Sequence, residues 1–224
     1  MPDFDIASIV RTVSVAAIPV LFAITLHEVA HGWAARACGD RTAEMLGRLS
    51  INPLRHIDPV GTVAVPILIF LLSAGSFLFG WAKPVPVSSS GLRNPKRDMV
   101  VVAAAGPAMN LVMASFWTLI LALSIRLGES LMIADFLRAM AQIGIFFNIL
   151  LAVFNLLPLP PLDGGRVLRG LVPESIGRRL DAIEPFGLII IVLLLTAGVI
   201  GPLMWPLISS LQGLLFRIAS ILGG

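Results

Sequence analysis

The residues of this chain with the clearest chemical potential are two histidines and a glutamate in the sequence Leu26–His31, which lies inside a long apolar run. An ionisable side chain at membrane depth costs about 2.5–3.5 kcal/mol even on lenient insertion scales, so three together require a compensating use. On a helix, residues four apart project from one face, so His27 and His31 can both reach a single metal ion. Glu28 is rotated by about 100° from His27, which suits it to act on a water at the metal rather than to be a ligand.

Chance is the alternative explanation of this pattern, because a solvated helix can carry two histidines and a glutamate at this spacing without any metal. In an apolar helix that explanation is poorer, since a buried glutamate without a partner is costly. The pattern therefore indicates a zinc ion held by two histidines, with Glu28 placed to act on water.

The composition is that of an integral membrane protein in contact with a lipid bilayer. Of the 224 residues, 57% are hydrophobic and only 13% are charged, whereas soluble domains contain about 25% charged residues. The mean hydropathy is +0.95. The net charge of +3 comes from basic residues in a few loops, and no basic run is interleaved with aromatic residues. This charge indicates topology and not nucleic-acid binding.

Apolar segments recur along the whole chain, and each is long enough to cross a bilayer, which requires about 20 residues. They cover residues 6–35, 59–80, 98–125, 131–157 and 185–222. The polar connections between them are too short to hold a further folded domain. We therefore expect a single membrane domain over residues 1–224 and an all-α, polytopic helical bundle.

The basic residues indicate which of these segments cross the membrane. The loops that follow 6–35, 59–80 and 131–157 each carry four basic residues. If 59–80 crosses, the two sides of the membrane hold nearly equal positive charge. If 59–80 enters and leaves by the same face, all these loops lie on one side, which the positive-inside rule favours.

We therefore expect about four spanning helices plus a re-entrant segment, with the N-terminus outside and the basic loops in the cytoplasm. The spans are expected at about 6–35, 98–125, 131–157 and 185–210, and the re-entrant segment at 59–80, where Pro66, Gly75 and Gly80 break regular helix. The last apolar segment is expected to cross once and then to end in a broken or interfacial helix. His27 lies nine residues before Arg36, or about 14 Å along a helix. The site is thus expected inside the bilayer, nearer the cytoplasmic face.

Two histidines are too few for a catalytic zinc, which takes three protein ligands and leaves one position open. The strongest candidate for the third ligand is Asp163. Three prolines at 158–161 must break the preceding helix, and Gly164 and Gly165 permit a tight turn after the carboxylate. The alternative is an aspartate that only caps the next helix.

His56 is the remaining histidine and precedes Asp58-Pro59. It is either a fourth ligand of a resting site or a loop histidine that hydrogen-bonds a turn, and the second interpretation is the simpler.

These motifs, taken together, resemble the site-2 protease family of intramembrane zinc metalloproteases. The resemblance is carried by His27-Glu28-x-x-His31, by Asn155-x-x-Pro158-x-x-Pro161-Leu162-Asp163-Gly164, and by Gly106-Pro107-x-x-Asn110, which is similar to the family's third recurring motif. The stretches at 47–61 and 80–87 are similar to the short bacterial branch, which has neither PDZ nor CBS domains.

The resemblance implies that His27, His31 and Asp163 ligate one zinc ion, that Glu28 is the general base and that Asn155 assists catalysis. It implies a multi-pass protein of the inner (plasma) membrane whose active site opens toward the cytoplasm. It also implies that the substrates are transmembrane proteins, cut within or near their spanning segments. Neither the substrate nor the oligomeric state follows from the sequence.

Several alternatives stay open at this point. Asn155 is otherwise a packing amide bonded across the bundle, and Gly106 and Asn110 are interpreted first as residues that let two helices pack closely, with contact between Asn110 and the site as the lesser alternative. Residues 80–87 are a candidate extended element for pairing with substrate.

Two other classes of function are also weighed. A catalytically silent protein that binds membrane segments is disfavoured by the intact Glu28. A metal transporter is disfavoured because no relay of acids or histidines runs through the other apolar segments.

Overall fold

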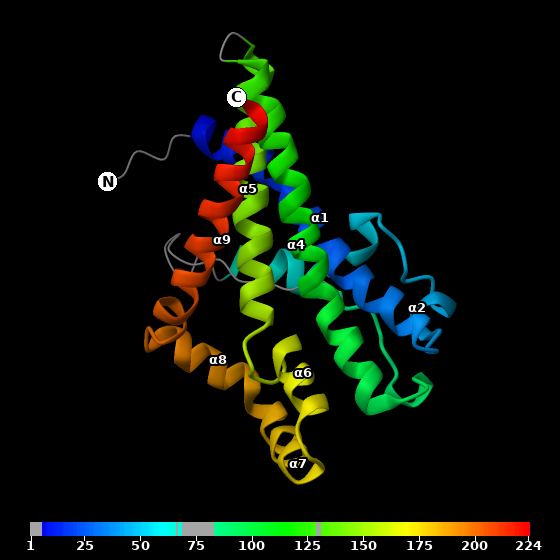
Figure 1. Cartoon of the computed structure of the whole chain (residues 1–224). Helices are drawn as coiled ribbons and strands as arrows, with labels where there is room; N and C mark the ends of the chain where they lie inside the picture. The colour runs from blue at the N-terminus through cyan, green and yellow to red at the C-terminus, as the bar shows by residue number, and fades with distance from the viewer. Residues whose placement is uncertain (1–5, 66, 69–82, 129–130) are drawn as a thin grey trace.

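The computed structural model describes residues 6–65, 67–68, 83–128 and 131–224, which are mainly helical and contain no strand (Figure 1). Four helical segments in these ranges are long and apolar enough to cross a membrane, namely Val13–Ala37, Pro95–Leu127, Ile133–Asn155 and Ile200–Gly223. The predicted all-α membrane fold is thereby confirmed.

The described residues form helices and helical turns in the following order. They are α1 (Ile6–Ala37), α2 (Thr42–Met45), a 3-10 turn (Pro53–His56), a π-helical turn (Pro59–Ala64), a 3-10 turn (Ser89–Gly91), α4 (Pro95–Leu127), α5 (Met132–Asn155), α6 (Asp163–Leu171), α7 (Glu174–Ile183), a 3-10 turn (Glu184–Phe186), α8 (Gly187–Thr196) and α9 (Ile200–Gly223).

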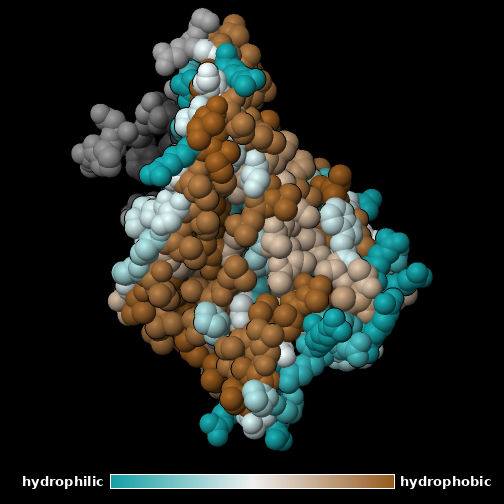
Figure 2. Space-filling view, viewed as in Figure 1, coloured by the Kyte–Doolittle hydropathy of each residue, from teal (hydrophilic) through white to brown (hydrophobic). Residues whose placement is uncertain are grey.

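The bundle is built around α4, which packs against α1, α5, α6 and α9 (Figure 1). Its apolar core includes Ile145 and Ile149 of α5, both with no exposed surface, and Trp117 of α4. The outer surface is apolar as well, and Figure 2 shows a broad hydrophobic area over the bundle with hydrophilic residues gathered toward its ends. Side chains such as Leu111 and Phe116 of α4 are exposed on it. An apolar exterior of this extent suits a lipid environment.

The ends of α4 follow from local sequence. Pro95 occupies the first turn, where its missing N–H is not needed. The N–H of Asn94 donates to Asp98 Oδ2 over 2.8 Å, and this acidic side chain lies in the first turn, where the helix dipole favours negative charge. Gly128 ends the helix with a φ of +72°, a conformation that glycine adopts without strain.

The C-terminal end of α1 lies close to the segment that precedes α4. The N–H of Arg93 donates to the Cys38 carbonyl over 3.0 Å, and the N–H of Lys83 donates to the His56 carbonyl over 2.9 Å. The chain between residues 56 and 83 therefore starts and ends at one point of the structure. The predicted re-entrant segment 59–80 falls largely outside the described residues.

The basic loop after α5 lies at this same end of the bundle. Lys96 Nζ, in the first turn of α4, donates to the Val172 carbonyl over 2.7 Å, and α6 packs against α4. The three basic loops are thus neighbours in space, which is the arrangement that the charge argument requires. The position of the bilayer and the four expected spans remain predictions.

In the last apolar segment a short helix comes first and a long helix second, whereas the crossing helix was expected first from the sequence. Gly198 has a φ of +71° and separates α8 from α9. α8 has 10 residues, or about 15 Å of helix, and is too short to cross. The long apolar helix is α9, Ile200–Gly223, so the break comes before the long helix and inside the expected span 185–210. The left-handed conformation that glycine permits accounts for the position of this break.

We predict that Asp40 fastens the segment before α4 to the end of α1. Its Oδ1 accepts from the N–H of Thr42 (2.9 Å) and its Oδ2 from the N–H of Ser88 (2.7 Å). Burial opposes ionisation, but these hydrogen bonds outweigh it and lower the pKa of the Asp40 carboxyl below its ordinary value. An Asp40→Asn variant places an NH₂ against one of these N–H donors. It should be less stable at pH 7 by about 1–3 kcal/mol, measured by unfolding in detergent micelles.

The pH dependence of this difference has a definite sign. Because the pKa is lower in the folded protein, the stabilisation is complete above the unfolded value of about 3.9 and is lost as the pH falls through the folded value. The control is Asp98→Asn, since the Asp98 contact with the N–H of Asn94 uses a single carboxylate oxygen, which asparagine retains. Equal effects of the two substitutions at pH 7 would contradict this role of Asp40.

Candidate metal centre

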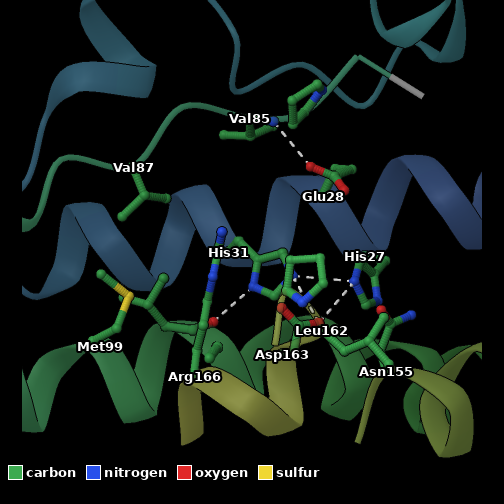
Figure 3. A pocket seen from close by; sticks show the side chains of 14 residues that line it. His27, Glu28, His31, Val85, Val87, Met99, Asn155, Leu162, Asp163 and Arg166 are labelled. Carbon is green, nitrogen blue, oxygen red and sulfur yellow. Dashed lines mark hydrogen bonds and ion pairs between the residues drawn. The ribbon is translucent and has the colours of Figure 1, made fainter. Parts of the chain in front are cut away.

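The structure brings together the three predicted metal ligands. His27 and His31 lie on the face of α1 that meets α4 and α6 (Figure 3). Their Nε2 atoms are 3.1 Å apart, and Asp163 Oδ2 lies 3.2 Å from His27 Nε2 and 3.3 Å from His31 Nε2. His27 and Asp163 are buried, and 12% of the His31 side chain is exposed. Among the described residues, these form the one cluster of three histidine, cysteine or acidic side chains whose ligand atoms lie within 4.8 Å.

Asp163 is the first residue of α6, and the two glycines after it let α6 approach the preceding backbone. A Cβ on Gly164 would lie 2.3 Å from the carbonyl oxygens of Leu156 and Leu157, and one on Gly165 would lie 2.5 Å from the Pro160 nitrogen. Neither glycine is among those with positive φ. Close approach of two backbone segments, rather than a tight turn, is therefore why glycine is required here.

The carboxylate of Asp163 is placed for a cation. Burial raises its pKa, but the two imidazoles beside it, when protonated, outweigh burial and lower the pKa of the Asp163 carboxyl to about 2. Its Oδ2 atom is buried and accepts no hydrogen bond of good geometry. Buried polar atoms are almost always satisfied, so a carboxylate oxygen that faces two imidazole nitrogens without a hydrogen bond fits a metal ligand.

The outer ring nitrogens of both histidines donate, which leaves the inner ones free to bind metal. His31 Nδ1 lies 2.7 Å from the Val102 carbonyl, which can only accept, so the proton is on Nδ1 and Nε2 carries a lone pair. His27 Nδ1 lies 2.6 Å from Asn110 Oδ1. Two imidazole nitrogens and one carboxylate oxygen, with a further position open to the pocket, fit a catalytic zinc.

The third recurring motif thus contributes directly to the site. Asn110 contacts His27, although a packing role was the first expectation from its sequence. Gly106 packs against both imidazoles, since a Cβ there would lie 2.4 Å from His31 Nε2 and 2.7 Å from His27 Cε1. The spacing of the motif does not indicate which face of α4 contacts the two histidines.

Glu28 lies beside the three ligands and points toward the segment before α4 (Figure 3). Its Oε2 accepts from the N–H of Val85 over 2.9 Å. This contact was not expected from sequence, because it joins residues 57 positions apart. The Val85 N–H is thus occupied, and Pro84 and Pro86 have none, so residues 84–86 offer no free N–H to a pairing strand. Residues 80–82 of the candidate extended element fall outside the described chain.

The ligands and Glu28 line a pocket of about 210 Å³ whose wall includes Asn155 and Arg166. The Asn155 amide donates to the Leu151 carbonyl of its own helix over 3.0 Å. The interpretation of Asn155 as an amide bonded across the bundle is therefore not what the structure shows. Arg166, on α6, carries the only positive side chain among the pocket-lining residues.

His56 lies apart from the metal cluster and does not line this pocket. It is buried, and its Nε2 donates to the Ser50 carbonyl over 2.7 Å. This is the loop histidine of the simpler interpretation.

Comparisons with known proteins agree with this geometry. The sequence matches Peptidase family M50 over residues 15–133 and 124–197. It is 36% identical over 206 residues to a Bacillus subtilis protein named "Putative zinc metalloprotease YwhC", covering 91% of this chain and 90% of that protein. It is 33% identical to "Putative zinc metalloprotease Rip2" of Mycolicibacterium smegmatis, covering 78% of this chain and 64% of that protein. No solved structure was found to match.

A helical membrane bundle with a buried site of two histidines and one aspartate defines the class as a membrane-embedded metallopeptidase. The chain belongs to peptidase family M50. The resemblance to the site-2 proteases drawn from the sequence motifs is thereby confirmed, and neither the silent binder nor the transporter is favoured.

We predict that Gly106→Ala separates metal binding from folding. Alanine favours helix over glycine by about 1 kcal/mol, so α4 should persist. The added methyl group must displace both imidazoles, and the affinity for zinc should fall at least about tenfold. A competition titration with a chromogenic chelator measures the affinity, and circular dichroism measures helix content.

Gly213→Ala in α9 is the matched control, because nothing lies within 4 Å of a Cβ at that position. It should leave the zinc affinity unchanged. Wild-type affinity in the Gly106→Ala protein would show that the imidazoles do not occupy the positions described.

Proposed function

We propose that this peptidase is a zinc enzyme that hydrolyses peptide bonds within or near the transmembrane segments of other membrane proteins. One observation carries the proposal: the ligand atoms of His27, His31 and Asp163 converge within 4.8 Å, beside Glu28 and in a pocket inside an apolar bundle. The names of the relatives support zinc as the metal.

The residues of the site have separate roles in the proposed hydrolysis. His27, His31 and Asp163 would hold the zinc, which when bound supplies the Lewis acidity that polarises a peptide carbonyl and acidifies water. Glu28 takes the proton of the attacking water and delivers it to the leaving nitrogen. The hydrogen bond from Val85 to Glu28 Oε2 holds this carboxylate at the pocket wall.

Asn155 is the proposed donor to the substrate. Its side chain lies in the pocket wall at the end of α5. One Nδ2 proton is used by the Leu151 carbonyl, and the amide has a second proton for the carbonyl oxygen as negative charge develops on it.

The location of the site sets a requirement on substrates. A helical substrate uses its carbonyls in its own hydrogen bonds, so it must unwind locally before a peptide carbonyl can enter the pocket. The site lies toward the end of the bundle that carries the basic loops, beside α6, where water is closer than at the bundle centre. These features favour cleavage of substrates whose helices are weak or have already been cut.

We predict that Glu28→Gln abolishes cleavage and retains zinc. The amide cannot accept the proton, so the rate should fall by at least about a hundredfold. Two probes are used: casein in detergent, whose carbonyls need no unwinding, and a single-span membrane protein in liposomes. Zinc is measured by atomic emission on the same preparations.

Glu44→Gln is the matched control, because Glu44 pairs with Arg36 and Arg41 at the surface and lines no part of the pocket in the described chain. It should cleave at the wild-type rate. Retained cleavage by the Glu28→Gln protein would exclude Glu28 as the base.

We further propose that the end of the bundle with α6 and α7 faces the cytoplasm across a bacterial plasma membrane. Its support is the gathering of the three basic loops at this end. In a Cys38→Ser background, an Arg178→Cys variant places a thiol on α7, and a Gly224→Cys variant places one at the opposite end (Figure 1).

A membrane-impermeant maleimide should then label the first thiol only in inside-out vesicles and the second only in right-side-out vesicles. Labelling in the opposite vesicles would reverse the orientation. Labelling of both thiols from one side would contradict the described bundle.

A further inference from the structure

We propose that Asn148 and Asn110 form a relay of two buried amides that fixes the proton of His27 on Nδ1 and so keeps Nε2 available for metal. The inference rests on the proposed zinc site and deepens it by naming two positioning residues. Neither residue faces the pocket, and Asn148 belongs to no motif found in the sequence.

The relay crosses three helices. His27 Nδ1 of α1 lies 2.6 Å from Asn110 Oδ1 of α4, and Asn110 Nδ2 lies 3.0 Å from Asn148 Oδ1 of α5. Both asparagines have no exposed surface, and His27 is 7% exposed. The relay is therefore shielded from water, which would otherwise offer each group a donor or an acceptor.

Backbone carbonyls at two points of the relay set its direction. Asn148 Nδ2 donates to the Gly144 carbonyl over 2.8 Å, and Asn110 Nδ2 also donates to the Ala23 carbonyl over 3.1 Å. Carbonyls only accept, so Asn148 must turn its Oδ1 toward Asn110. Both Nδ2 protons of Asn110 are then used, and its Oδ1 is the atom left for His27.

A reversed Asn110 amide would be strongly disfavoured. Its oxygen would face the Ala23 carbonyl and Asn148 Oδ1, which places acceptor against acceptor in two contacts of a low-dielectric interior. Rotation of Asn148 would relieve one of these contacts and create another against the Gly144 carbonyl. The observed direction satisfies every donor and acceptor of the relay.

The direction of the relay determines the chemistry of His27. Because Asn110 Oδ1 accepts, neutral His27 carries its proton on Nδ1 and presents a lone pair on Nε2 toward Asp163 and His31. With the opposite tautomer, which is the more populated one in free histidine, the Nε2 proton would occupy the metal position. His31 needs no such relay, since the Val102 backbone carbonyl fixes its proton directly.

Substitutions of Asn148 test the relay without touching the pocket. Asn148→Leu removes the acceptor for Asn110 Nδ2 at similar volume. Asn148→Ser is the second variant, because a serine hydroxyl can still donate to the carbonyl four residues earlier but is too short to reach Asn110. Thr118→Val is the matched control, since this buried hydroxyl donates to the Ala114 carbonyl of its own helix and, among the described residues, to no member of the relay.

Two readouts are made on the full-length protein in detergent. The zinc affinity is measured by competition with a chelator, and both Asn148 variants should bind about tenfold more weakly than wild type, with Thr118→Val unchanged. The Nδ1 proton of His27 is observed in ¹H–¹⁵N spectra of the zinc-loaded protein, where its contacts with Asn110 distinguish it from the Nδ1 proton of His31. It should be hydrogen-bonded and slow to exchange with water in wild type, and it should shift upfield and exchange faster in both Asn148 variants.

The possible outcomes are distinct. Zinc affinities of both Asn148 variants within twofold of wild type would overturn the inference. So would an equal loss in Thr118→Val, or a loss of affinity with the shift and exchange rate of the His27 Nδ1 proton unchanged. A wild-type chain that binds zinc but cleaves neither casein nor a membrane reporter would contradict the proposed function alone, whereas a wild-type chain that binds no zinc would overturn both.

Discussion

The structure depends on one electrostatic constraint: three ionisable side chains from α1 and α6 meet around one point inside an apolar bundle. Each alone would be costly at membrane depth. Together, with Asp163 Oδ2 beside both Nε2 atoms, they form a set that a divalent cation satisfies. The prolines before α6 and the close approach at Gly164 are explained by the need to bring this carboxylate back to α1.

α4 packs against His27 and His31 and orients both imidazoles. Gly106 leaves room for both imidazoles, the Val102 carbonyl orients His31, and Asn110 orients His27. The three proposed ligands therefore come from α1 and α6, while their orientation comes from α4, which contributes none of them. Catalytic power and metal affinity should consequently be sensitive to residues that never touch substrate, as outer partners of metal sites generally are.

The sequence predicted that His27, His31 and Asp163 would lie together and that there would be about four long apolar helices, because helical spacing, helix-breaking prolines and hydrophobic length are local properties. It did not predict that Val85 would hold Glu28 or that Asn148 would support Asn110, since both contacts depend on how each helix is rotated about its axis. The glycines after Asp163 were assigned to a turn, although they serve a close backbone contact that only the packed structure reveals. The sequence also did not predict that the short helix α8 would precede the long helix α9, because few charges mark that part of the chain.

The central claim is that one zinc ion is bound by His27, His31 and Asp163. X-ray absorption at the zinc edge, on the full chain reconstituted in lipid, tests it most directly. We expect a four-coordinate shell with two imidazole nitrogens and oxygen ligands at about 2.0–2.2 Å, and one imidazole fewer in the His31→Gln protein. A shell of oxygens alone, or one that contains the sulfur of Cys38, would contradict it.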